Sequence, residues 1–331
     1  MTTIIRFSPA KINLSLAVSG CRPDGYHDLD SVVALLSLGD EVTLTQAEAT
    51  NLHVVGEGVD LSAMPEDCER NLAVRAVRLL EGATGRSLPT AITITKRIPL
   101  GGGLGGGSSN AATVLKGMVA LWKLDISEAD LIALAAQLGS DVPLFLLDGT
   151  VRMRGRGEAI ERLPMPNAKP LHLVLANDGT HCPTPQVYRA LDAARGQTEN
   201  FSFKGLTDGG VFCDTLCLSL REGKAEQVAQ WVFNDLEAPC LADFPGVRSA
   251  AEALREAGCR GVLLCGSGGT VCGIVDRAED GERVLAHPAL AQCWRASVQT
   301  LPDGVMAAHG PLTPIVMVRI HVGQPCPQRL S

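Results

Sequence analysis

The sequence lacks the runs of lysine and arginine with which proteins follow a nucleic-acid backbone. Its 29 Lys and Arg residues are outnumbered by 36 Asp and Glu residues, and the formal net charge is −7. Aromatic residues make up only 4% of the chain and are not interleaved with a basic patch. These absences argue against a nucleic-acid partner, so we expect the partners to be small molecules.

Long apolar stretches are also missing. No stretch of 18 apolar residues occurs in the 331-residue chain, so the sequence predicts no transmembrane helix. The first residues, "MTTIIRFSPAKINLSLAV", show neither a basic region followed by an apolar core nor a small-residue cleavage site. We therefore expect a cytoplasmic protein that does not bind a membrane.

Cysteine is present, but not in a pattern that indicates a disulfide framework or a metal site. The 11 cysteines are an odd number and are scattered along the chain. Cys213 and Cys217 form the closest pair, and no second Cys or His pair follows at metal-ligand spacing. The sequence therefore predicts reduced thiols and no structural metal site.

Glycine, in contrast, is concentrated at residues 101–107, where six of seven positions are Gly. Residues 90–98 before it alternate β-branched and polar side chains, which predicts a strand. After it, apolar residues recur at helical spacing: Ala111, Val114, Leu115, Met118 and Trp122. Ser108 or Ser109 is the predicted N-cap of this helix.

A glycine loop between a strand and a helix leaves unpaired N–H groups at the positive end of the helix dipole, and such a point binds phosphate. A purely structural loop is the alternative. No lysine follows the glycines before the serines, which excludes a Walker-type loop. Gly101, Gly103 and Gly106 fit G-x-G-x-x-G, but Ser127 and Asp130 then open a helix where a dinucleotide fold needs a strand.

The remaining patterns predict a mixed α and β chain in two domains. Residues 163–170 carry three prolines and form the predicted boundary. We expect an N-terminal phosphate-binding domain at 1–165, a C-terminal substrate-cleft domain at 166–302, and a tail at 303–331 that is either an edge strand or a segment that orders on contact. Residues 225–237 and 247–258 predict helices, and residues 261–275 predict a strand, a glycine turn and a second strand.

Four further polar or aromatic positions are candidates for chemistry. Lys11 stands in a strand-like run, and Asp141 stands beside an apolar run where an ammonium is its natural partner. For each, an ordinary solvated charge is the alternative. The chain has only two tyrosines, Tyr26 beside His27 in a turn and Tyr188 after a proline-stiffened loop. A clamp for a flat ligand is one interpretation, and a turn with an anchoring Tyr is the other.

Three motifs together resemble a known superfamily of kinases. They are "PAKINLSLAVSGCRPDGYHDLDSV" at 9–33, "PLGGGLGGGSSNAA" at 99–112 with "GSDVPLF" after it, and "GSGGTVCGIV" at 266–275. In order and spacing they are similar to the superfamily of galactokinase, homoserine kinase and mevalonate kinase. "DGYHDL" and "PTPQVY" resemble one family within it, the kinases that act on 4-diphosphocytidyl-2-C-methyl-D-erythritol.

The resemblance implies an α+β fold of two domains, an N-terminal one like ribosomal protein S5 and a C-terminal ferredoxin-like one. It implies transfer of the ATP γ-phosphate to the 2-hydroxyl of an acceptor that carries a cytidine diphosphate group, with Mg²⁺ as cofactor, in isoprenoid precursor synthesis. We expect a monomer or a weak homodimer. Homoserine kinase or mevalonate kinase activity, and a non-catalytic nucleotide sensor, are the alternatives.

The resemblance also implies roles for individual residues. Lys11 and Asp141 are the expected catalytic pair. The expected ATP-binding residues are Asn71, Leu72, Pro99, Leu100, Gly101, Gly102, Gly103, Leu104, Gly105, Gly106, Gly107, Ser108 and Ser109, with Ser108 as the candidate Mg²⁺ ligand. The expected acceptor-binding residues are Asn13, Tyr26, His27 and Tyr188. Gly269 stands where the family has a small residue with a β-carbon, which predicts a looser third motif.

Overall fold

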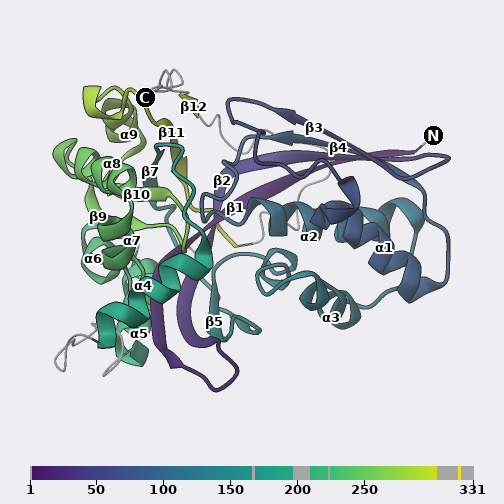
Figure 1. The fold of residues 1–331 in the computed structure, drawn as a ribbon, viewed down its shortest axis with the longest axis horizontal. Coiled ribbons are helices and arrows are strands. Elements are labelled where there is room, and N and C mark those ends of the chain that lie inside the picture. The colour runs from purple at the N-terminus through teal and green to yellow at the C-terminus, as the bar shows by residue number, and fades with distance from the viewer. Residues whose placement is uncertain (1, 166–167, 197–208, 223, 304–319, 322–331) are drawn as a thin grey trace.

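The computed structural model describes residues 2–165, 168–196, 209–222, 224–303 and 320–321, and within them the chain forms two β-sheets with helices packed on both (Figure 1). The long strands β1 (Thr3–Cys21) and β2 (His27–Gln46) pair antiparallel and run through the middle of the molecule. Elements on either side of this hairpin therefore share its two strands as a support.

The first sheet has the order β3-β4-β2-β1-β8, with β5 paired to β2 and β6 paired to β5. Its other strands are β3 (Asn51–Gly56), β4 (Thr90–Lys96), β5 (Val151–Gly155), β6 (Ala159–Arg162) and the two-residue β8 (Phe233–Asn234). Because β8 lies far along the chain and pairs parallel to β1, the later part of the chain completes a sheet that the first part begins.

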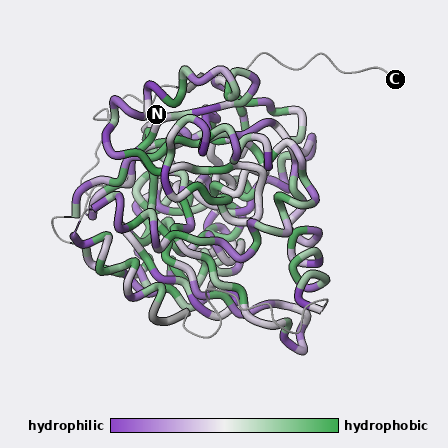
Figure 2. Tube along the Cα trace, turned by 90° about the vertical axis from the view of Figure 1, so that its left-hand side faces the viewer, coloured by the Kyte–Doolittle hydropathy of each residue, from purple (hydrophilic) through white to green (hydrophobic). Residues whose placement is uncertain are grey.

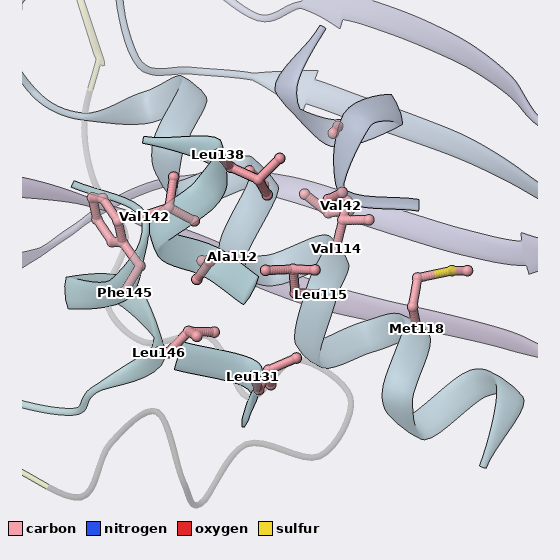
Figure 3. Packing of buried hydrophobic residues seen from close by; sticks show 14 of the residues in the cluster. Val42, Ala112, Val114, Leu115, Met118, Leu131, Leu138, Val142, Phe145 and Leu146 are labelled. Atoms are coloured by element: carbon pink, nitrogen blue, oxygen red, sulfur yellow. The ribbon is translucent and has the colours of Figure 1, made fainter. Parts of the chain in front are cut away.

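Helices α1 (Leu72–Thr84), α2 (Gly106–Trp122) and α3 (Glu128–Leu138) lie on the same side of the first sheet (Figure 1). Leu115 and Met118 of α2 belong to one buried cluster with side chains from β2, α3 and the 3₁₀ turn η2 (Pro143–Leu146), part of which Figure 3 shows. The apolar face predicted for α2 is thus the face that the core covers.

The second sheet has the order β12-β11-β7-β10-β9. Its strands are β7 (His172–Asn177), β9 (Arg260–Leu264), β10 (Thr270–Val275), β11 (Trp294–Gln299) and β12 (Ile320–His321). Helices α8 (Pro245–Glu256) and α9 (Ala278–Leu285) pack against this sheet. The other elements in this half are α4 (Thr184–Gly196), α5 (Gly209–Glu222), α6 (Ala225–Trp231), α7 (Glu237–Asp243) and the 3₁₀ turn η3 (Pro288–Leu290), while η1 (Cys68–Arg70) precedes α1.

The two sheets share one apolar core. Leu173 and Leu175 of β7 point to a cluster that also contains Ile12 and Leu14 of β1. The intervening Val174 belongs to a second cluster, formed with α8 and α9, because successive strand residues face opposite sides. Figure 2 shows that hydrophobic and hydrophilic residues are interleaved along the coloured parts of the trace.

Most of the predicted elements are confirmed, and two details are wrong. The expected strand, glycine loop and helix are β4, residues 97–105 and α2, but the N-cap is Gly105 and neither Ser108 nor Ser109. Gly105 can adopt the left-handed φ of 72° that this cap has, and its carbonyl accepts the Ser109 amide at 2.9 Å. The helix consequently begins three to four residues earlier than predicted.

The helix predicted at 225–237 is wrong as one element. It is divided into α6, β8 and the start of α7, because Phe233 and Asn234 pair with β1. The predicted strand, turn and strand at 261–275 are confirmed as β9 and β10. In the tail, Ile320–His321 forms an edge strand on β11, as one of the two interpretations expected; the rest of 304–331 lies outside the described residues.

None of the helices that the structure describes combines the length and the apolar character needed to cross a membrane.

Candidate active site

The glycine loop joins the end of β4 to the N-terminus of α2. Gly101, Gly103 and Gly105 have φ values of 66°, 79° and 72°, a region that residues with a side chain rarely adopt. Leu104 between them is buried in the shared core, and its carbonyl accepts the backbone N–H of Lys11 at 2.9 Å. The loop is therefore anchored at its centre to the strand that carries the candidate catalytic lysine.

A second glycine turn, between β9 and β10, packs directly on this loop. A β-carbon on Gly103 would overlap the Cys265 carbonyl, and one on Gly268 would overlap the Gly103 amide. The Thr270 amide also donates to the Gly102 carbonyl at 3.3 Å. At these positions, glycine permits backbone-to-backbone contact between the two halves of the molecule, a reason that the sequence did not reveal.

The third motif is not loosened by Gly269. A β-carbon there would overlap the carbonyl oxygen of Thr180, so the glycine permits a closer approach of the two segments. The looser turn expected from the sequence is therefore wrong for this chain.

The open side of the loop faces α1. Gly107 is exposed, and the nearest atom to a β-carbon on it would be Leu72 Cδ1 at 3.9 Å. Asn71, the neighbour of Leu72, caps α1 by accepting the Ala73 amide at 2.9 Å. The structure thus brings Leu72 and its neighbour Asn71 close to the start of α2; their role in ATP binding stays a prediction.

The two loop serines differ in accessibility. Ser109 is fully buried and its Oγ lies 2.8 Å from Ser8 Oγ, whereas Ser108 is only half-buried. On the other side of the loop, His181 Nδ1 would lie 2.9 Å from a β-carbon on Gly101. His181 is thus a loop neighbour that sequence reasoning missed, since it comes from the second half of the chain.

The candidate catalytic pair is assembled. Lys11 Nζ lies 3.9 Å from Asp141 Oδ2, and the exposed fractions of the two side chains are 7% and 39%. Lys11 also donates to Asn13 Oδ1 at 2.5 Å, and Asn13 donates to Ser31 Oγ at 2.8 Å. A β-carbon on Gly105 would lie 2.9 Å from Lys11 Cγ, which places the lysine directly under the glycine loop. The ammonium is buried and held, while the carboxylate is open to a ligand.

Aromatic rings form a second part of the site. The rings of His27 and Tyr188 lie 5.1 Å apart at 41°, and His27 Nε2 lies 2.8 Å from Asp192 Oδ1. Tyr26 is 58% exposed, with the Arg156 guanidinium 5.3 Å from its ring centre. The structure therefore pairs Tyr188 with His27, and Tyr26 with Arg156.

Asp192 and Arg156 were missed by the sequence analysis. Asp192 follows Tyr188 by four residues on α4, a spacing that puts both on one helix face and could have indicated the pair. Arg156 stands in the turn after β5, and its approach to Tyr26 depends on the pairing of β5 with β2.

The aromatic part lies close to the charged part. Burial, and after it the negative charge of Asp141, together raise the pKa of Tyr188 to about 12. Tyr188 is therefore a neutral phenol at physiological pH and lies within electrostatic range of the candidate catalytic carboxylate.

Among the described residues, no three or more His, Cys, Asp or Glu side chains gather as a metal cluster. What the site does hold is a glycine-rich helix N-terminus, a buried ammonium, an open carboxylate and an aromatic pair. The first three fit phosphoryl transfer, which requires a phosphate cradle, cations and a group near the accepting hydroxyl.

Two family models match the chain. The GHMP kinases N terminal domain matches residues 71–149, and the GHMP kinases C terminal model matches residues 218–288. The first model covers the chain from Asn71 through the glycine loop and helices α2 and α3. The second model covers the glycine turn between β9 and β10, which packs on that loop.

Among known proteins, the chain is 42% identical over 287 residues to 4-diphosphocytidyl-2-C-methyl-D-erythritol kinase of Deinococcus radiodurans. The matched residues make up 86% of this chain and 88% of that protein. It is 41% identical over 264 residues to the kinase of the same name from Mycolicibacterium smegmatis, with 79% and 78% covered.

The fold agrees with solved structures. A crystal structure of 4-(cytidine 5'-diphospho)-2C-methyl-D-erythritol kinase matches with a TM-score of 0.72 and 32% identity, over 90% of this chain and 100% of that one. Homoserine kinase from Cytophaga hutchinsonii, at 17% identity over 92% and 96%, has a TM-score of 0.67 and shares the fold. The chain belongs to the 4-diphosphocytidyl-2-C-methyl-D-erythritol kinase family of the GHMP kinases, and has their two-domain α+β fold.

Proposed function

We propose that this protein transfers the γ-phosphate of ATP to the 2-hydroxyl group of 4-diphosphocytidyl-2-C-methyl-D-erythritol, a step in isoprenoid precursor synthesis. The observation that carries the proposal is the convergence on one place of the glycine loop, the Lys11–Asp141 pair and the Tyr188–His27 pair. The name shared by relatives at 36–42% identity supports this acceptor over homoserine or mevalonate.

ATP binds at the glycine loop in this proposal. The first N–H groups of α2 lack partners within the helix and point at the β- and γ-phosphates, with the helix dipole behind them. Asn71 and Leu72 form the adenine side of the site, next to the exposed Gly107. Residues 99–109 supply backbone contacts, and the buried Leu104 side chain anchors the loop.

Asp141 and Lys11 act on the acceptor. Asp141 orients the 2-hydroxyl group and accepts its proton, and the buried Lys11 ammonium offsets the negative charge of the transferred phosphoryl group. Asn13 fixes the direction of the ammonium through its 2.5 Å hydrogen bond. Such positioning and charge balance account for most of the catalysis in phosphoryl transfer, because a loose transition state demands little covalent help.

Mg²⁺ is the proposed cofactor. The half-buried Ser108 hydroxyl fits this ion, which takes one or two protein oxygens and fills its other positions with phosphate oxygens and water. Held there, the ion would supply positive charge that offsets the charge of the phosphate groups. The fully buried Ser109 does not fit this role.

The cytidine diphosphate group binds on the aromatic side. Tyr188 offers a ring face for the cytosine, and Tyr26, His27 and Asn13 line the same region. Tyr26, 58% exposed, is free to close over a ligand. The monomeric or weakly dimeric state and the cytoplasmic location stay predictions.

The test is an ATP-consumption assay with the purified chain against the cytidyl acceptor, homoserine and mevalonate. We expect ATP to be consumed with the cytidyl acceptor and not with homoserine or mevalonate, and we expect this turnover to depend on Mg²⁺. Turnover with another alcohol would contradict the acceptor, and nucleotide binding without turnover of any alcohol would support a sensor in its place.

A further inference from the structure

A fully buried cluster of polar side chains lies behind the glycine loop, and none of these side chains contacts a substrate in the proposed function. Its members are Ser8, Asp40, Lys96, Ser109 and Asn110, and each is less than 5% exposed. Buried polar groups are costly unless they are paired, so a cluster of this size needs a reason beyond packing.

Asp40 is the centre of this cluster. Its Oδ1 accepts the backbone N–H groups of Arg97 at 2.8 Å and Ile98 at 3.0 Å, the residues through which β4 enters the glycine loop. Its Oδ2 accepts the Lys96 ammonium and the Asn110 amide, the latter at 2.9 Å. One carboxylate therefore holds the chain on both sides of the loop, the end of β4 and the second turn of α2.

The cluster continues from Asp40 to the loop and to β1. Lys96 Nζ donates to Asn110 Oδ1 at 3.2 Å and would lie 3.0 Å from a β-carbon on Gly106, the first residue of α2. Asn110 also donates to Ser8 Oγ at 2.9 Å. Ser8 precedes Lys11 on β1 by three residues, so the same network sets the helix N-terminus relative to the catalytic lysine.

We propose that Asp40 is a positioning residue for the phosphate-binding loop. This inference rests on the proposed use of that loop for ATP. It states that Asp40 sets the distance between the last residues of β4 and the first turns of α2. The N–H groups that bind the phosphates converge only when β4 and α2 are held together. The Asp40 carboxylate joins these two elements through its hydrogen bonds. Lys96 of β4 forms an ion pair with Asp40 and also donates a hydrogen bond to α2, so it joins the same two elements.

The test is Asp40→Asn. The amide oxygen can still accept the two backbone N–H groups, but its NH₂ group faces the Lys96 ammonium and the Asn110 amide as donor against donor. We expect the Kd for ATP, measured by calorimetry without acceptor, to rise about tenfold or more, because small displacements of positioned groups are costly. The KM for the cytidyl acceptor should change less than about twofold.

The double variant Asp40→Asn with Lys96→Gln rebuilds the network without charge, since the Gln oxygen can accept from Asn at position 40. We expect it to restore the Kd for ATP to within about threefold of the original value. Asp30→Asn is the matched control. Asp30 lies on the same strand and forms an ion pair with Arg152 at a distance of 2.7 Å, and this pair is not part of the network around the loop. It should leave the Kd for ATP unchanged.

Should Asp40→Asn fold poorly, Ser8→Ala removes one hydroxyl of the cluster and should raise the Kd for ATP about 2- to 10-fold. An unchanged Kd in folded Asp40→Asn or Ser8→Ala protein would overturn the inference, as would an equal rise in the Asp30→Asn control. Because nucleotide affinity is measured without acceptor, failure of the proposed acceptor leaves this comparison decisive.

Discussion

At the scale of single residues, the charge of Asp141 is the feature on which the proposed chemistry depends most. Asp141→Asn keeps the shape of the side chain but removes its charge, 3.9 Å from the Lys11 ammonium. A positioned proton acceptor contributes about 10²- to 10⁴-fold in rate, so we expect kcat to fall at least about 100-fold. Steady-state kinetics and an ATP-binding titration check this result.

The Kd for ATP should stay within about threefold in that variant, because the adenine and phosphate contacts are made elsewhere. Near-normal turnover by Asp141→Asn would contradict the assignment of Asp141. Lost ATP binding with lost turnover would instead place Asp141 among the nucleotide contacts.

Tyr188 belongs to the same scale. Base-on-aromatic stacking is worth about 1–3 kcal/mol, so Tyr188→Ala should raise the KM for the cytidyl acceptor about 5- to 150-fold. The ring is remote from the reacting hydroxyl, and kcat should change less than KM. Tyr188→Phe keeps the ring face and is expected to restore most of the affinity. Kinetics with each substrate varied in turn measure both effects.

Two outcomes would count against a cytosine platform at Tyr188. The first is equal damage from Ala and Phe, since that would assign the role to the phenol hydroxyl. The second is damage confined to the KM for ATP. The Tyr26→Ala variant is a useful comparison, because Tyr26 is exposed and its ring lies beside the Arg156 guanidinium.

At the scale of elements, the loop and the helix after it make opposite demands on Gly107. In the free protein this helical position is open, with only Leu72 Cδ1 near a β-carbon, at 3.9 Å. Gly107→Ala should therefore stabilise the fold by up to about 1 kcal/mol through helix propensity. If the backbone at Gly107 contacts phosphate, the same methyl group should weaken ATP binding about fivefold or more.

Thermal melting and ATP calorimetry on one preparation of Gly107→Ala separate these effects. A variant with a higher melting temperature and weaker ATP binding supports the phosphate contact. Unchanged ATP binding would show that the loop does not approach phosphate at this residue. Gly82→Ala in α1, where a β-carbon meets nothing within 4 Å, controls for propensity alone.

The elements themselves could be predicted from the sequence where local pattern decides them. The alternation before the glycines and the helical spacing after them are local, and both are confirmed. The N-cap could not be found in this way, because glycine at Gly105 is chosen by its positive φ and by contact with Lys11. Likewise, β8 is decided by a partner strand more than 200 residues earlier, which overrides the helical pattern around it.

The candidate site was predictable in its motifs and not in its supports. Lys11 and Asp141 stand out because charges in apolar runs are unusual. Asp40 does not stand out, since its partners lie 56 to 70 residues away. A signal existed for Lys96, which the alternation of β4 places on the buried face with Ile92 and Ile94.

At the scale of the whole molecule, the two halves are joined more tightly than separate domains usually are. Ile12 and Leu14 of β1 share a core with Leu173 and Leu175 of β7. The two glycine turns also pack backbone against backbone. Neither half can therefore unfold without exposing apolar surface of the other, and exposure of such surface is unfavourable.

We accordingly expect a single cooperative transition in calorimetry, with equal calorimetric and van't Hoff enthalpies, although chains of two domains often show two transitions.

Gly268→Ala tests the coupling, because a β-carbon there overlaps the Gly103 backbone and must push the two turns apart. Overpacking costs about 1–3 kcal/mol, so this variant should melt at a lower temperature, still in one transition, and bind ATP more weakly. Gly20→Ala, with nothing within 4 Å of a β-carbon, should change neither property. Two resolved transitions in the unmodified protein would show that the halves are stable independently, and that the shared core contributes less than its burial indicates.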